Sequence, residues 1–243
     1  AHRAVLYAIA VIGPPASQAL VAGLLGLDPV ILRAHIAHLV AAGFLTEGDT
    51  GVAFRHMLLH DTAYAMIAPP DRARLHGEVV RLLETGADPT RPEPLPETLA
   101  LHAQEAGDTG RALDYWIRAS NAAIYRAAGQ AAIAFARQGL ALVDPERPES
   151  ALQEMRLQLS LAPALMAQSG YGAQDVGRAY QRAHLLSERT GSEKARLRAL
   201  LGLWVHTWVA GRLGESLVHS RALLEIAERT QDNALRLQGH GGV

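Results

Sequence analysis

The chain has 243 residues, of which 49 % are hydrophobic and 19 % charged, a composition that supports a folded core and argues against intrinsic disorder. The formal net charge is −1, so the overall charge does not direct the protein towards nucleic acid or an anionic membrane. The absence of cysteine excludes disulfides, thiolate nucleophiles and cysteine-ligated zinc. Lys194 is the only lysine, which excludes a P-loop of the pattern G-x-x-x-x-G-K-[ST].

Alanine, leucine and arginine dominate the sequence and runs of β-branched residues are scarce, which predicts a mainly α protein. Residues 4–12, AVLYAIAVI, resemble the core of a signal peptide, but they lack a basic leader and a cleavage site, so we expect a helix there. No apolar run reaches the length of a membrane span. We expect a cytoplasmic protein, and the missing initial methionine suggests a piece of a longer polypeptide.

Residues 1–55 begin with three predicted helices. The first covers 1–13, and Ser17 is placed to cap a second over 18–26. Asp28 followed by Pro29 is a strong start signal for the third, because proline is favoured at the first helical position. Apolar side chains at helical spacing mark the face of the third helix that we expect to be buried: Leu32, Ile36, Leu39 and Val40.

A β-hairpin is predicted over 44–56, with its tight turn at 48–51. Three helices followed by a hairpin is the order of a winged-helix domain. A helix that reads DNA presents Arg, Lys, Asn or Gln to bases and phosphates. The outward side of 28–42 offers one permanent charge among small side chains and a histidine: Arg33, Ala34, Ala37, His38 and Ala41. We therefore favour a structural or protein-contacting role and regard nucleic acid as an unlikely partner, with DNA binding as the alternative.

Two more helices are predicted near 56–68 and 70–85. The stretch 86–96, GADPTRPEPLP, contains four prolines and has the composition of a linker. We expect three parts: a winged-helix-like domain at 1–68, a connecting helix with the proline-rich linker at 69–96, and helical repeats at 97–243.

The segment after the linker has the pattern of helical hairpins. A glycine followed by small and aromatic residues at the spacing of a tetratricopeptide repeat occurs at Gly107, Ala112, Trp116 and Ala119. The spacing of the second helix returns at Val176, Tyr180 and Ala183. Small residues let two helices approach, and the aromatic ring fills the groove between them. The sequence therefore predicts a TPR-like α-solenoid with stretched repeats, in which stacked neighbours cover each other's apolar faces.

His56 and His60 lie four residues apart and Asp61 follows the second, which resembles part of a helical zinc motif. The glutamate that would act as general base is missing, and no third ligand is evident. A structural histidine pair is the favoured interpretation, and an enzyme with a metal site is the less favoured one. Two roles are also considered for Trp204 and Trp208. The pair could line a ligand groove of the solenoid, but packing between repeats is favoured.

No nucleophile elbow and no dinucleotide-binding glycine motif occurs in the sequence. The paired carboxylates lie in the linker or on solvated helix faces. We therefore expect no catalytic residues, no cofactor and no metal ion in this chain.

Four blocks of the sequence, in order, resemble one family. The stretch 54–64 resembles F-[R/K]-H-x-L-[L/I]-x-D-x-x-Y through Phe54, Arg55, His56, Leu58, Asp61, Ala63 and Tyr64. The stretch 71–84 resembles R-x-x-L-H-x-x-[IV]-A-x-x-L-E through Arg72, Leu75, His76, Val79 and Leu82. The stretches 106–120 and 157–180 resemble A-G-x-x-x-x-A-x-x-Y-W-x-x-A and L-x-L-x-L-G-x-A-L-x-A-x-x-G-Y-x-A-x-E-V-x-x-A-Y, with Asp175 where glutamate is usual.

These blocks are similar to the winged-helix and TPR region of STAND-type ATPase signalling proteins, related to MalT-like and LuxR-type activators. The closest resemblance is to adenylate/guanylate cyclases that carry an AAA ATPase module and a tetratricopeptide tail. The resemblance implies a non-catalytic regulatory fragment whose solenoid binds a protein partner or small effector. It also implies an upstream nucleotide-binding module as a partner within the parent chain. The ATPase and cyclase modules are not in this sequence, so their activities do not transfer to it.

Overall fold

A computed structural model describes residues 1–86, 88, 93–147 and 150–230. It divides into two compact units, Ala1–Ala112 and the residues from Leu113 onward, which we treat separately. The described residues form twelve helices and one two-stranded antiparallel sheet. The prediction of a mainly α fold with a small β-hairpin is therefore confirmed.

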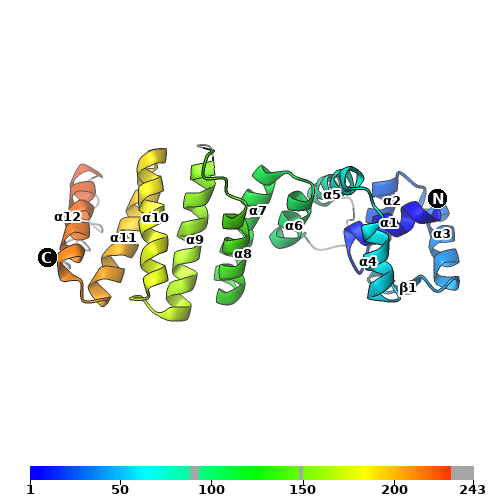
Figure 1. The fold of residues 1–243 in the computed structure, drawn as a ribbon, viewed down its shortest axis with the longest axis horizontal. Helices are drawn as coiled ribbons and strands as arrows, with labels where there is room; N and C mark the ends of the chain where they lie inside the picture. Colours follow the sequence, from blue (N-terminus) through cyan, green and yellow to red (C-terminus); the bar gives the residue numbers. More distant parts are fainter. Residues whose placement is uncertain (87, 89–92, 148–149, 231–243) are drawn as a thin grey trace. The chain divides into compact units, whose positions relative to one another are not determined.

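The first unit contains six complete helices and the hairpin among its described residues (Figure 1). In chain order the elements are α1 His2–Ile12, α2 Gln18–Leu25, α3 Pro29–Ala41, β1 Leu45–Gly48, β2 Gly51–Phe54, α4 Met57–Ala65, α5 Pro69–Glu84 and α6 Pro96–Glu105. Helix α7, Thr109–Tyr125, begins in this unit and continues into the second.

The predicted start signals of the second and third helices are present in the structure. The Ser17 hydroxyl accepts a hydrogen bond from the Leu20 amide at the start of α2. The Asp28 carboxylate accepts one from the Val30 amide at 2.8 Å, and Pro29 is the first residue of α3. Both caps satisfy amides that have no partner inside their own helix.

The hairpin pairs Leu45 with Phe54 and Gly48 with Gly51, so only two residues form the turn. Its second strand is tied to the segment before α2, because Ala16 and Val52 exchange backbone hydrogen bonds of 2.8 and 2.9 Å. The hairpin is thus fixed both to its own partner strand and to the preceding helical segment.

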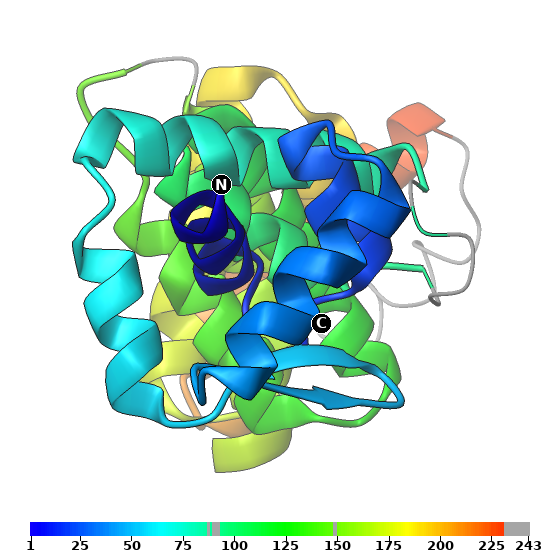
Figure 2. The same cartoon turned by 90° about the vertical axis from the view of Figure 1, so that its right-hand side faces the viewer.

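Helix α1 forms the centre of the first unit, with α2, α3, α4 and α5 packed around it (Figure 2). One apolar cluster joins α1, α3 and the hairpin through side chains that include Ile9, Ile36 and Val52. A second cluster joins Val11 of α1 to Val79 of α5. These contacts bury the faces of α1 that a lone helix would expose.

The second unit continues from α7 with α8 Gly129–Ala141, α9 Ala151–Ser169, α10 Gln174–Thr190, α11 Glu193–Val209 and α12 Leu213–Thr230. Each of α8 to α11 packs against the helix that follows it, and these helices lie side by side in Figure 1. One large apolar cluster extends from α7 to α11, and a smaller cluster joins α11 to α12.

Glycines allow unusually close helix contacts in the second unit. A Cβ at Gly139 of α8 would lie 2.7 Å from the Leu157 side chain of α9. A Cβ at Gly177 of α10 would overlap the ring of His206 of α11.

The His206 ring is fixed by two hydrogen bonds, to the Tyr171 carbonyl at Nδ1, 2.9 Å, and to the Arg212 guanidinium at Nε2, 2.6 Å. Because the carbonyl only accepts and the guanidinium only donates, Nδ1 carries the ring proton.

Helices α5 and α6 pack against each other within the first unit, on either side of the predicted linker. Part of that linker, residues 87 and 89–92, lies outside the described residues. No single described helix is both long and apolar enough to cross a membrane; α2 and α3 meet that test only as a pair bent by 112°.

Candidate functional site

A row of five aromatic rings runs from the end of the hairpin to α6. Phe54 contacts His60 edge to face with ring centroids 5.5 Å apart, and His60 stacks on Tyr64 at 6.1 Å. Tyr64 meets His76 at 5.9 Å, and His76 meets His102 at 5.0 Å. The row brings two of the sequence blocks together, the junction stretch 54–64 and the stretch 71–84, and adds His102. We call the polar part of this row, Tyr64, His76, His102 and Glu105, the α4–α6 junction.

The two imidazoles at the centre of the α4–α6 junction are bonded to each other. Nδ1 of His76 lies 2.8 Å from Nδ1 of His102, and the residues are only 4 % and 7 % exposed. The pair joins α5 to α6. A buried imidazole needs partners for its ring nitrogens, and each ring supplies one for the other.

Tyr64 connects this pair to α4 and to the surface. Its hydroxyl lies 2.9 Å from Nε2 of His76 and 3.4 Å from the Glu105 carboxylate. A carboxylate only accepts, so Tyr64 donates to Glu105 and accepts from Nε2 of His76. With its proton on Nε2, neutral His76 accepts at Nδ1 from His102. One direction of donation therefore satisfies all four groups.

The surroundings of the α4–α6 junction hold both imidazoles neutral. Burial lowers the pKa of His76 from 6.5 to about 4, and the positive charge of Arg72 acts in the same direction. Burial also lowers the pKa of His102 to about 4, helped by His76 and opposed by Glu105. Burial raises the pKa of Tyr64 above 10, with Glu105 contributing. Arg72 additionally lies over the Tyr64 ring, 4.9 Å from its centroid.

The histidines of the zinc-like motif have separate surroundings. His60 uses Nδ1 on the Asp61 carboxylate at 3.0 Å and Nε2 on the Ala10 carbonyl at 3.2 Å, so both of its ring nitrogens are engaged. His56 is exposed at the N-cap of α4, and Arg55 is exposed beside it. Within the described ranges, no group of three or more His, Cys, Asp or Glu side chains has the arrangement of a metal site.

Sequence reasoning placed Phe54, Tyr64 and His76 in family blocks but attached no role to His102 or Glu105. These two residues lie 26 and 41 positions from their partners His76 and Tyr64. Only the packing of α6 on α5 brings them together, so no local pattern could have indicated the α4–α6 junction.

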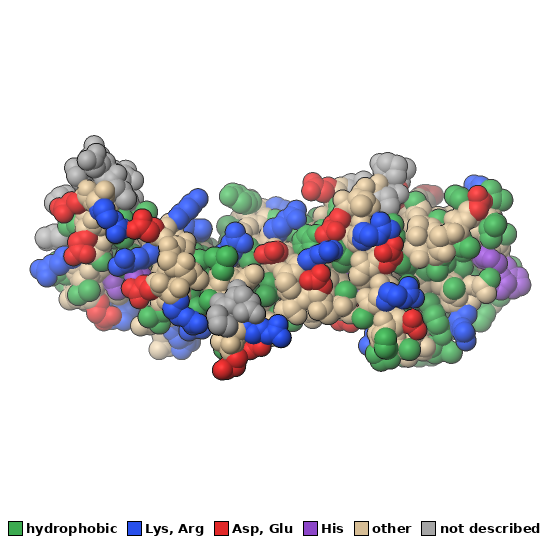
Figure 3. Space-filling view, turned by 90° about the horizontal axis from the view of Figure 1, so that it is seen from above, with side chains coloured by type: hydrophobic (Ala, Val, Ile, Leu, Met, Phe, Trp, Pro, Cys, Tyr) green, Lys and Arg blue, Asp and Glu red, His purple; other side chains and the backbone are tan. Residues whose placement is uncertain are grey.

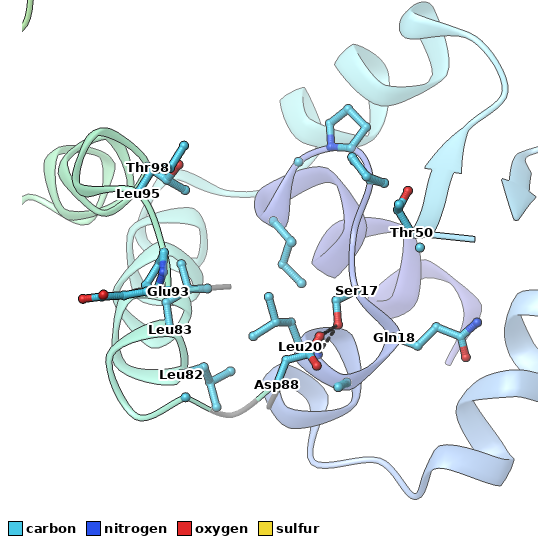
Figure 4. Close-up of a pocket in the computed structure, with 18 of the residues that line it drawn as sticks. Ser17, Gln18, Leu20, Thr50, Leu82, Leu83, Asp88, Glu93, Leu95 and Thr98 are labelled. Carbon is cyan, nitrogen blue, oxygen red and sulfur yellow. Dashed lines mark hydrogen bonds between the residues drawn. The ribbon is translucent and has the colours of Figure 1, made fainter. Parts of the chain in front are cut away.

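An open groove of about 1310 Å³ lies in the first unit between α2, the hairpin turn and the end of α5 (Figure 4). Its described lining combines apolar, neutral polar and acidic side chains and has no Lys, Arg or His. The neutral polar ones are Ser17, Gln18, Thr50 and Thr98, and the acidic ones are Asp49, Glu84, Asp88 and Glu93. Ser17, which caps α2, donates a hydrogen bond to Asp88 at this groove. The described part of this lining therefore offers no cation to a phosphate.

The outward face of α3 is mainly apolar, with Arg33 and His38 as its exposed polar side chains. Val30 and Ile31 are 64 % and 51 % exposed, and Ala34 and Ala37 are exposed between them and the end of the helix. Basic and acidic side chains are interspersed on the face of the molecule drawn in Figure 3 and form no continuous basic area there. The helix that would read DNA in a winged-helix protein thus offers mainly hydrophobic surface.

The predicted repeat-packing residues are mostly buried. Gly107 has φ +76° in the turn before α7, where a left-handed conformation favours glycine, and Ala112 is fully buried in α7. In the second unit Trp116 and Ala119 of α7, and Tyr180 and Ala183 of α10, are buried. The Trp116 ring stacks on Phe135 of α8 at 5.7 Å.

The two tryptophans proposed for a ligand groove differ in their surroundings. Trp204 is half-buried and packs against the apolar cluster of Leu200, Leu223 and Ile226 between α11 and α12. Trp208, one turn later, is 56 % exposed. Trp204 therefore contributes to helix packing, whereas Trp208 belongs to the surface.

Comparisons of the chain with protein-family models, with curated proteins and with solved structures find no match.

Proposed function

We propose that this chain is a non-catalytic regulatory segment of a STAND-type ATPase signalling protein. In this proposal α1 to α4 with the hairpin form a winged-helix-like domain that contacts an upstream nucleotide-binding module. The helices of the second unit form a TPR-like solenoid that binds a protein partner or small effector. Binding there shifts the ATPase between two states, which requires different affinities for the two states.

The apolar outward face of α3 is the observation that carries the proposal. A DNA-reading helix needs several cationic or amide side chains on this face, but Arg33 is its only permanent charge. Exposed Val30 and Ile31 instead provide hydrophobic area of the kind buried in protein contacts. A protein neighbour for this helix is therefore better supported than a nucleic acid.

The second unit supports a binding role through its architecture. Its helices pack in chain order, and Gly139, Gly177 and Gly202 let neighbouring helices approach closely. Arrays in which each helix pair contacts only its neighbours leave extended surfaces free for partners.

The α4–α6 junction supports the coupling part of the proposal. Tyr64, His76 and His102 link α4, α5 and α6 through side-chain hydrogen bonds. A displacement of α6 would be transmitted to α4 through these bonds. Hydrogen-bonded connections between packed helices are one means by which a change at one site reaches another.

The proposal is tested on the parent protein. We expect the residues encoded before Ala1 to contain a Walker A lysine and a Walker B carboxylate; their absence would overturn the assignment. We then expect Val30→Glu to change the rate of ATP hydrolysis by the full-length protein, because a charge replaces apolar contact area. Arg74→Gln, at an exposed position of α5 and outside α3, is the control and should leave that rate unchanged. Equal rates for wild type and Val30→Glu would contradict the contact proposed for α3.

A DNA-binding regulator is the second candidate, favoured by the order of three helices and a hairpin with Arg33 and Arg55 exposed. It predicts binding to duplex DNA that weakens steeply with salt and is lost in the Arg33→Gln/Arg55→Gln variant. We expect no such binding in an electrophoretic mobility shift measured at several salt concentrations.

A further inference from the structure

The His76–His102 pair is the only contact we find in the described residues in which two buried imidazoles bond directly to each other. When both rings are neutral, one proton lies between the two Nδ1 atoms, which are 2.8 Å apart, and forms the hydrogen bond. If both rings are protonated, both Nδ1 atoms carry hydrogen and neither accepts, so the bond cannot form. Two positive charges would then face each other in a buried site, which is strongly unfavourable.

We propose that the His76–His102 pair is an acid-sensitive latch, in which proton uptake by the two rings releases α6 from α5. The inference is independent of the proposed function, because it concerns only the contact between these two helices. Helix α6 buries Leu99, Ala100 and Ala103 on the same side as His102, so its release exposes a short apolar face.

The charged and titratable groups that face the pair come from three helices. Tyr64 of α4 contacts His76, Arg72 of α5 opposes a positive charge on His76, and Glu105 of α6 favours one on His102. Helices α1 and α2 also pack on α5. Near Leu75 and Val79 they contribute apolar side chains such as Val11 and Leu24, and Tyr7 of α1, whose hydroxyl donates to the Met66 carbonyl. Glu105 carries a single negative charge and also bonds Tyr64, so it cannot offset two added positive charges.

The direction of the effect follows from the two states of each ring. In the closed state the pKa of each imidazole is about 4, and in the open state it returns towards 6.5. The open state thus binds more protons between these values, and the stability of the closed state is complete above 6.5 and falls as the pH drops towards 4. Proton linkage raises the equilibrium constant for opening by up to about tenfold for each unit that the pH falls and for each proton taken up.

The test is hydrogen exchange of the whole chain, read by mass spectrometry between pH 6.5 and 4 and corrected for the intrinsic pH dependence of exchange. Peptides of α6 report the opening, and peptides of α1 serve as an internal reference for global unfolding. His102→Asn and His76→Asn each keep a polar group near the position of Nδ1 but do not titrate. His56→Asn, which replaces the exposed histidine at the N-cap of α4, is the matched control.

In wild type we expect the opening of α6 to rise by up to about a hundredfold per pH unit, the limit for two protons. Each single Asn variant should reduce this to about tenfold, and His56→Asn should match wild type. An NMR titration of wild type with selectively ¹⁵N-labelled histidine is a second measurement, which gives the pKa of each ring and needs no variant. Equal slopes in all four proteins, or both rings titrating near 6.5 while α6 stays protected, would overturn the proposal.

Discussion

The ring of Tyr180 on α10 lies against Gly202 on α11, in the space that a side chain at position 202 would occupy. This contact is one reason why the two helices pack closely. We expect Gly202→Ala to destabilise the second unit by about 1–3 kcal/mol, the usual cost of overpacking a well-filled core. Chemical denaturation followed by circular dichroism measures the change.

Gly214 provides the control for this prediction. It lies in α12, and a Cβ at that position would meet no heavy atom within 4 Å. Gly214→Ala should leave stability unchanged or raise it by up to about 1 kcal/mol, because alanine favours helix. If both variants unfolded at the same denaturant concentration, the proposed Tyr180 contact would not limit the packing of α10 and α11.

The sequence predicted those features that depend on neighbouring residues. Ser17, Asp28 and Pro29 mark helix starts through local hydrogen bonds and a fixed backbone angle, and these positions agree with the structure. The hairpin turn at 48–51 is equally local. Such signals require no knowledge of how the helices pack.

The α4–α6 junction could not be predicted in this way. His102 looks like one of several scattered histidines until α6 packs on α5 and brings it to His76. The same limit applies to Trp204 and Trp208, since two residues on one helix are adjacent by spacing, yet only one lies in the contact with α12. Spacing identifies a helix face but not what covers it.

Gly51 makes the hairpin's contact with the segment before α2 possible. Its φ is +143°, and a Cβ there would overlap the Ala16 carbonyl that pairs with Val52. We expect Gly51→Ala to break this pairing and to destabilise the first unit by about 1–3 kcal/mol, through backbone strain and lost hydrogen bonds. Thermal unfolding monitored by circular dichroism tests the effect.

Gly48→Ala is the comparison for Gly51. Gly48 lies opposite Gly51 in the hairpin, but a Cβ at this position would only touch the Gly51 carbonyl at 4.0 Å, and its φ is not in the left-handed region. This variant should unfold within a few degrees of wild type. A comparable loss in both variants would mean that the turn itself, and not the contact with Ala16, determines the cost.

Arg182 of α10 forms a two-point hydrogen-bonded ion pair with Glu154 of α9, at 2.6 and 2.8 Å. The Glu154 side chain is only 12 % exposed, so removing its partner leaves a poorly solvated carboxylate. We expect Arg182→Gln to cost about 1 kcal/mol of unfolding free energy, the upper range for an ion pair whose arginine is partly exposed.

Arg178→Gln makes the same change on the same helix at an exposed pair with Asp175. Exposed pairs contribute little, so its effect should stay within about 0.5 kcal/mol. If the two variants lost equal stability, the bond between α9 and α10 would be no stronger than a surface pair.

Trp204 and Trp208 differ by one helical turn, which makes them a matched pair for separating packing from surface exposure. Removing Trp204 leaves a gap against Leu200 and Leu223, and the cost of such large-to-small changes is about 3–5 kcal/mol when the ring is fully buried. Because Trp204 is only half-buried, we expect Trp204→Ala to cost about half of that range and Trp208→Ala to cost less than about 0.5 kcal/mol.

Tryptophan fluorescence gives a second measurement on the same two variants. In Trp204→Ala the exposed Trp208 contributes more of the emission, so the spectrum should shift to longer wavelength, and in Trp208→Ala it should shift to shorter wavelength. Because Trp208 supports no core, Trp208→Ala also tests a binding role without loss of fold. A Trp208→Ala protein that unfolds as readily as Trp204→Ala would show that both indoles support the α11–α12 contact, and the surface role of Trp208 would then be withdrawn.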